Sequence, residues 1–118
     1  MRSDPLVLIA EDDDSVRMTL EIVLHDEGFR VLTASDGQEA LEAARASRPD
    51  VILIDGVMPK LSGDEVLRRL RAEGSLEAEV FVLSGMEAEP GQWGDAHIIG
   101  KPFDIDELVV NIRRAIAG

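Results

Sequence analysis

The chain has 118 residues, no cysteine and a net charge of -12 at pH 7. This length suits one hydrophobic core, so we expect a single domain over residues 1–118. The missing cysteines exclude a disulfide framework and a thiolate metal site. The negative charge argues against direct binding of nucleic acid or of an acidic membrane surface. No apolar run approaches the roughly 20 residues of a membrane span, and the short polar start is unlike a signal peptide, so we expect a cytoplasmic protein.

Five short apolar runs have the length and the β-branched composition of buried strands. We predict strands over Leu6–Ala10, Phe29–Ala34, Val51–Asp55, Val80–Leu83 and Ile98–Ile99. Apolar residues at helical spacing fill the gaps between these runs. Strands that are separated by helices pair in parallel through right-handed crossovers. The sequence therefore predicts an α/β fold, a doubly wound five-stranded parallel sheet with helices on both faces.

The helix boundaries follow from capping residues. The first helix should take Asp14 or Ser15 as its N-cap and end at Gly28. The other regular helices are predicted over Gln38–Ala46, Asp64–Glu73 and Asp104–Ala117.

The segment Met86–Ala96 departs from this regular alternation. It contains Pro90, Gly91 and Gly94, each of which disfavours the interior of a helix. We therefore predict that the fourth helix is short, displaced or irregular. The single tryptophan, Trp93, lies in the same segment, and we predict that it packs on the core rather than anchoring a partner.

Polar residues follow four of the five predicted strands. Glu11 and Asp12 come after the first strand, Asp55 ends the third, Ser84 follows the fourth and Lys101 follows the fifth. Parallel strands bring their carboxyl ends to one edge of the sheet, where open α/β folds bind ligands. Carboxylate oxygens suit Mg²⁺, and a carboxylate can attack phosphorus to form an acyl phosphate. The set predicts that Asp55 is a phosphate acceptor, with the lysine and the metal stabilising the charge on the phosphoryl group.

Each of these features alone has an ordinary structural explanation. An acidic run before a helix usually caps that helix, an aspartate after a strand often starts a turn, and a Lys-Pro pair often only marks the start of a helix. Their occurrence together, at the ends of the right strands and in this order, favours the functional interpretation.

The chain resembles, over essentially its whole length, the receiver domain of two-component response regulators. The residues that carry the resemblance are the acidic pair Glu11 and Asp12, the motif Asp-x-x-Met-Pro-x-x-x-Gly from Asp55 to Gly63, Ser84 with Gly85, and Lys101-Pro102-Phe103. The resemblance implies the flavodoxin-like fold with sheet order 2-1-3-4-5. It also implies a phosphoacceptor switch rather than a conventional enzyme. Asp55 would receive a phosphoryl group from the phosphohistidine of a histidine kinase or phosphotransfer protein, and the resulting change would alter binding to a downstream protein.

The resemblance also implies a role for each residue of the site. Asp12 and Asp55 would ligate Mg²⁺ directly, Glu11 would do so through a water, and the backbone carbonyl of Val57 would complete the protein ligands. The phosphoryl oxygens would be bound by Ser84 and Lys101.

One position departs from the family pattern. The family usually has an aromatic residue three positions before the lysine, where this chain has Ile98. The resemblance therefore implies an altered readout of phosphorylation across the last strand. The receiver domain could be a stand-alone protein or a part excised from a hybrid histidine kinase or a larger regulator, and the sequence leaves that choice open.

Three other functions stay open at the level of the sequence. Residues Asp12 to Val16 fit the Asp-x-Asp-x-Val signature of haloacid-dehalogenase-like phosphatases, in which Asp12 would carry the phosphate, but Asp55 would then have no role. A pseudo-receiver would bind a partner without phosphorylation, although the complete set of site residues argues against it. A flavodoxin would need a Ser/Thr-rich phosphate loop after the first strand, where this chain is acidic.

Overall fold

A computed structural model describes residues 4–74, 76–85 and 93–117 of the chain. In these residues the strands are β1 (Leu6–Ala10), β2 (Arg30–Ala34), β3 (Val51–Asp55), β4 (Glu79–Ser84) and β5 (His97–Gly100). The helices are α1 (Asp14–Asp26), α2 (Gly37–Ser47), α3 (Gly63–Ala72) and α4 (Ile105–Ala117). The boundaries of the predicted strands and of these helices agree with the sequence-based ones to within about one residue at each end, which is the usual scatter at frayed ends.

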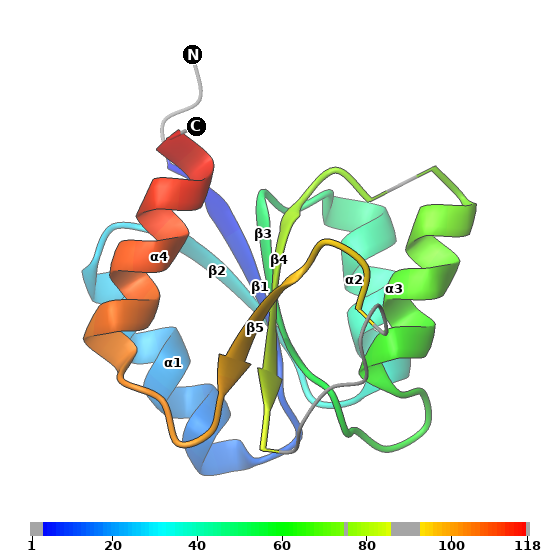
Figure 1. Cartoon of the computed structure of the whole chain (residues 1–118), viewed down its shortest axis with the longest axis horizontal. Coiled ribbons are helices and arrows are strands. Elements are labelled where there is room, and N and C mark those ends of the chain that lie inside the picture. Colours follow the sequence, from blue (N-terminus) through cyan, green and yellow to red (C-terminus); the bar gives the residue numbers. More distant parts are fainter. Residues whose placement is uncertain (1–3, 75, 86–92, 118) are drawn as a thin grey trace.

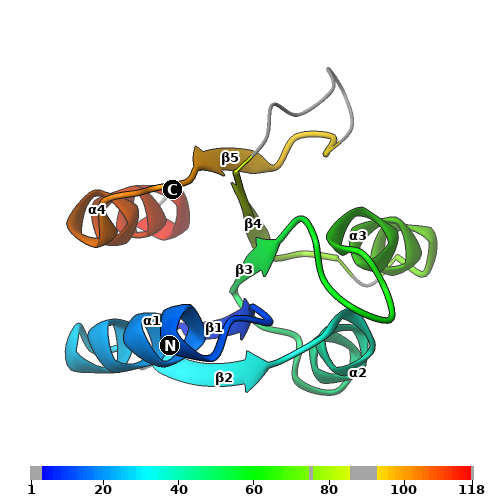
Figure 2. The same cartoon turned by 90° about the horizontal axis from the view of Figure 1, so that it is seen from below.

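The strands form one parallel sheet in the order β2-β1-β3-β4-β5. Figure 2 shows the layers, with α1 and α4 on one face of the sheet and α2 and α3 on the other. The predicted doubly wound, flavodoxin-like architecture is therefore confirmed. Because every pair of neighbouring strands is parallel, the carboxyl ends of all five strands lie at one edge, toward which the arrowheads of β4 and β5 point in Figure 1.

The period of two along each strand divides the core between the two faces of the sheet. In β1, Val7 and Ile9 face the α1–α4 side, whereas Leu8 and Ala10 face the α2–α3 side. The central strand β3 is buried along its whole length. Burial on both faces explains why these strands are continuous apolar runs rather than alternating ones.

Side-chain caps fix where the helices start. The backbone N–H of Val16 donates to Asp13 Oδ1 at 3.0 Å, so Asp13 is the N-cap of α1. The prediction of Asp14 or Ser15 was wrong by one residue, because any of several adjacent polar residues can cap and only the path of the chain selects one. Asp36 caps α2 through the N–H of Glu39 at 2.8 Å.

The short or irregular helix predicted between β4 and β5, over Met86–Ala96, falls mostly on residues 86–92, which lie outside the described residues. The described end of the segment, residues 93–96, is a turn closed by a hydrogen bond from the N–H of Ala96 to the carbonyl of Trp93 at 3.2 Å. Trp93 itself is buried in the apolar cluster on the α2–α3 side. The prediction that it packs on the core is confirmed.

The loop between β3 and α3 is packed directly against the start of α2. The N–H of Gly37 donates to the carbonyl of Pro59 at 3.3 Å. A methyl group on Gly37 would lie 1.7 Å from the carbonyl oxygen of Leu61. Glycine at this position is therefore required by the close approach of two backbones.

We expect Gly37→Ala to lower the free energy of unfolding by about 1–3 kcal/mol. Alanine is intrinsically favoured over glycine in a helix by about 1 kcal/mol, but the overlap with Leu61 forces the loop or the helix to move. Gly100→Ala is the matched control, since a methyl group there meets nothing within 4 Å. Urea unfolding of both variants measures the difference, and equal midpoints would contradict this account of the loop.

Candidate functional site

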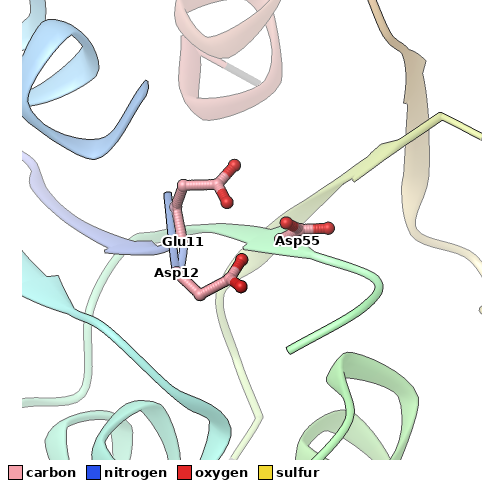
Figure 3. Close-up of side chains that lie close together, drawn as sticks. All are labelled: Glu11, Asp12 and Asp55. Atoms are coloured by element: carbon pink, nitrogen blue, oxygen red, sulfur yellow. The ribbon is translucent and has the colours of Figure 1, made fainter. Parts of the chain in front are cut away.

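Three carboxylates converge at the carboxyl edge of the sheet. Glu11 follows β1 and Asp55 ends β3, and these two strands are direct neighbours with Ala10 opposite Ile54. The side chains of Glu11, Asp12 and Asp55 point toward one common space (Figure 3), and one oxygen of each lies within 4.8 Å of the others. Glu11 and Asp55 are buried, at 1% and 8% exposure, whereas Asp12 is exposed.

Lys101 reaches this cluster from the end of β5. Its Nζ lies 3.3 Å from Glu11 Oε1 and 3.2 Å from Asp55 Oδ2. Its backbone N–H donates to the carbonyl of Ser84 at 2.9 Å, which ties the loop after β5 to the end of β4. The lysine therefore bridges the two buried carboxylates, one from each of the strands β1 and β3.

Burial dominates the electrostatics of Glu11. The pKa of its carboxyl group is raised to about 7, first because burial removes it from water and then because of the nearby Asp55 carboxylate, while the Asp13 N–H and Lys101 act in the opposite direction. Burial lowers the pKa of Lys101, but attraction to Asp55 and Glu11 outweighs this effect, so its pKa is raised overall. Lys101 is therefore a permanent cation in the physiological range.

Backbone and arginine contacts hold the acidic loop in place. The N–H of Asp13 donates to Glu11 Oε2 at 3.2 Å. The guanidinium of Arg17 donates to the carbonyl of Glu11 at 2.9 Å and to Asp14 Oδ1 at 2.6 Å. The sequence analysis assigned no role to Arg17. A cation near the start of a helix is unfavourable next to the helix dipole. Its presence there is a sequence signal that Arg17 makes a contact outside the helix.

Each oxygen of Asp55 has a defined partner. The N–H of Val57 donates to Oδ1 at 3.1 Å, and Lys101 lies at Oδ2. Ser84 ends β4, one residue beyond Leu83, which is the register partner of Asp55. Its side chain is half-buried. The structure thus brings Glu11, Asp12, Asp55 and Lys101 together and places Val57 and Ser84 on the strand ends beside them.

The donor set fits a divalent cation. When all three carboxyl groups are ionised, they and the one ammonium leave two negative charges in a space of a few ångströms. Carboxylate oxygens that gather in this way repel one another unless a cation lies between them, and oxygen-only donors suit a hard ion such as Mg²⁺. The exposure of Asp12 leaves one side of the cluster open to solvent.

Residues 7–113 match the sequence profile of the response regulator receiver domain. The chain belongs to the receiver domain family. The resemblance inferred from the sequence motifs is thereby confirmed, and with it the phosphoacceptor switch as the role of this kind of domain.

Curated relatives of this receiver domain are bacterial transcriptional regulators. It is 43% identical over 108 residues to the transcriptional regulatory protein AfsQ1 of Streptomyces coelicolor, covering 85% of this chain and 48% of that protein. It is 36% identical over 118 residues to the transcriptional regulatory protein CseB of Streptomyces avermitilis, covering 93% of this chain and 48% of that protein. The chain thus spans about half the length of the curated relatives it matches.

Solved receiver structures share the fold over almost their full length. The receiver domain of the sensor histidine kinase PA1611 from Pseudomonas aeruginosa, solved with a magnesium ion coordinated in its active site cleft, superposes with a TM-score of 0.88. The two chains are 28% identical, and the match covers 98% of this chain and 99% of that one.

Within the part of this receiver domain that the structure describes, no helix combines the length and apolarity needed to cross a membrane.

The buried carboxyl of Glu11 makes the stability of this receiver domain depend on pH. In the folded chain Glu11 keeps its proton up to about pH 7, whereas the unfolded chain releases it near the ordinary pKa of 4.5. Between these values the folded state binds more protons, so stability falls as the pH rises. In a chelating buffer above this range we expect Glu11→Gln to be more stable than the parent by on the order of 2 kcal/mol.

The control for this prediction is Glu21→Gln, which removes the same charge from an exposed position on α1. Thermal unfolding of the three chains across this pH range measures the difference. A Glu11→Gln variant that unfolds at the same temperature as the parent at every pH would contradict the burial argument.

Proposed function

We propose that Asp55 of this receiver domain accepts the phosphoryl group. The observation that carries the proposal is its position. It is a buried strand-end carboxylate with a lysine ammonium 3.2 Å from one oxygen and two further carboxylates facing it. A carboxylate oxygen of Asp55 attacks phosphorus, the bond from phosphorus to the histidine nitrogen of the donor breaks, and an aspartyl phosphate results.

The neighbours of Asp55 divide the remaining work. The N–H of Val57 orients the carboxylate by holding Oδ1. Lys101 moves from the carboxylate to the oxygens of the incoming phosphoryl group, whose negative charge it offsets. The hydroxyl of Ser84 donates a hydrogen bond to another of these oxygens. Phosphoryl transfer needs little beyond such positioning and charge stabilisation.

Glu11, Asp12, Asp55 and the carbonyl of Val57 would hold Mg²⁺ in this proposal. When bound, the ion neutralises the negative charge that gathers at the site during transfer. Glu11 contributes from a fully buried position and Asp12 from the exposed side. The raised pKa of Glu11 supports the assignment, because a carboxyl buried among acids is stabilised in its charged form by a cation.

The phosphodonor in this proposal is a histidine kinase or a histidine phosphotransfer protein. An apolar groove runs beside Lys101, between the start of α1 and the loop that follows β5, with Val16, Pro102 and Phe103 in its walls. Met18 and Ile22 lie exposed on α1, at 60% and 55%. A helix that presents a phosphohistidine could pack its apolar side there and bring the phosphorus to Asp55.

The output of the switch is a changed affinity for a downstream protein. The net charge of -12 opposes direct contact with nucleic acid, so any effect on transcription is exerted through a partner or through a further domain. We place this activity in the cytoplasm. The receiver acts only on its own phosphorylation and dephosphorylation.

Incubation with a small acyl phosphate donor and Mg²⁺ tests the acceptor assignment. We expect one added phosphoryl group by intact mass, absent in Asp55→Asn and in a chelating buffer. Asp26→Asn is the matched control, because Asp26 lies exposed at the end of α1 and away from the site.

Site mapping separates the alternatives to this assignment. Label on Asp12 would overturn the role of Asp55 and favour a phosphatase-like reaction. A chain that binds Mg²⁺ but stays unlabelled by both the small donor and phosphorylated histidine proteins would be a pseudo-receiver.

A further inference from the structure

The indole of Trp93 lies against the backbone of the residue that follows the phosphoacceptor. A methyl group on Gly56 would be 3.2 Å from Cζ2 and 3.4 Å from Cη2 of Trp93, and 3.9 Å from Cγ1 of Val82. Trp93 is 6% exposed and belongs to the apolar cluster on the α2–α3 side. A side chain at Gly56 would therefore force the indole to shift by a few tenths of an ångström.

Gly56 is also fixed by hydrogen bonds on both of its peptide groups. Its N–H donates to the carbonyl of Leu83 at 3.2 Å, and its carbonyl accepts from the N–H of Gly63 at 3.3 Å. The next residue, Val57, donates its N–H to Asp55 Oδ1 at 3.1 Å. The indole therefore packs on the backbone that orients the acceptor carboxylate and that carries the proposed metal-binding carbonyl of Val57.

Trp93 is in turn held by α3. The guanidinium of Arg71 donates to the carbonyl of Trp93 at 2.9 Å. Gly94 turns the chain with a φ of +63°, and a methyl group there would lie 3.2 Å from Arg71 Nη2. The turn before β5 is thus attached to the helix that begins where the phosphoacceptor loop ends.

We propose that Trp93 is a positioning residue for the phosphoacceptor loop. Its indole fixes the backbone of Gly56 and Val57, and thereby couples the occupancy of the Asp55 site to the turn that leads into β5. The inference rests on the proposed function of Asp55. At position 98, where the family usually has an aromatic residue, this chain has an isoleucine that is 44% exposed. The contact of Trp93 with Gly56 would provide another connection between the Asp55 site and the edge of the sheet.

Coupling and plain core packing make different predictions about Trp93. A residue that only fills the core changes stability when it is truncated and leaves ligand affinity untouched. A residue that positions the loop changes Mg²⁺ affinity, and by linkage Mg²⁺ must change the environment of that residue. Both directions of this relation can be measured.

The first measurement is the emission of Trp93 during a titration with Mg²⁺, then with beryllium fluoride as a phosphoryl analogue. The chain has one tryptophan and no tyrosine, so the signal comes from this position. We expect the emission to change in intensity or wavelength and to saturate with the same affinity that calorimetry gives for Mg²⁺.

The second measurement is the Mg²⁺ affinity of variants, by calorimetry. We expect Trp93→Leu to weaken Mg²⁺ binding by about fivefold or more, Trp93→Phe to restore part of the loss, and Arg71→Gln to act in the same direction as Trp93→Leu. Val80→Ala is the matched control, because Val80 is buried in the same cluster at the opposite end of β4. It should lower thermal stability and leave Mg²⁺ affinity at the parent value.

The outcomes separate this inference from the function on which it rests. If the parent chain neither binds Mg²⁺ nor becomes phosphorylated, the proposed function fails and the coupling fails with it. If the parent does both, but its emission is constant and Trp93→Leu binds Mg²⁺ as the parent does, Trp93 is a packing residue only and the inference is overturned.

Discussion

Placing carboxylates side by side away from water is unfavourable, and the carboxyl edge of this sheet does so with Glu11 and Asp55. Lys101 offsets part of the repulsion from a position 90 residues along the chain from Glu11. Only a fold that brings the ends of β1, β3 and β5 to one edge can assemble this group. The parallel sheet is therefore what makes the charge cluster possible, and the cluster offers the carboxylate oxygens that could hold a metal ion.

The loop after β3 turns that cluster into a defined site. Close backbone approaches at Gly37 and Gly63 leave no space for side chains, since a methyl group on Gly63 would lie 2.6 Å from the carbonyl oxygen of Asp55. At Gly56 the indole of Trp93 packs on the backbone. The packing of Gly37 ties the loop to α2, and the packing of Gly56 ties it to the turn at Trp93. The site is thus linked through the loop to α2 and to the turn at the edge of the sheet, the arrangement a switch needs to transmit a local change.

Most of the fold and most of the residues of the site could be predicted, because they depend on sequence patterns within short stretches of the chain. Apolar runs of strand length, helical spacing and strand-end polar residues gave the sheet and the set Glu11, Asp12, Asp55 and Lys101. The N-cap of α1 was missed because neighbouring polar residues cap equally well. The bond from Arg17 to the carbonyl of Glu11 was not predicted, because it depends on the path of the loop. The contact between Trp93 and Gly56 has no sequence signal, since neither residue type specifies a partner.

The sequence by itself determined the secondary structure, the parallel order of elements and the chemistry available at the carboxyl edge. These follow from periodicity and from the rule that parallel strands share an edge. Only the tertiary structure decided which carboxylates are buried, how Lys101 bridges them, and which apolar side chain closes the loop beside Asp55. Burial, pKa and van der Waals contact depend on distances between residues far apart in the chain, and folding alone sets those distances.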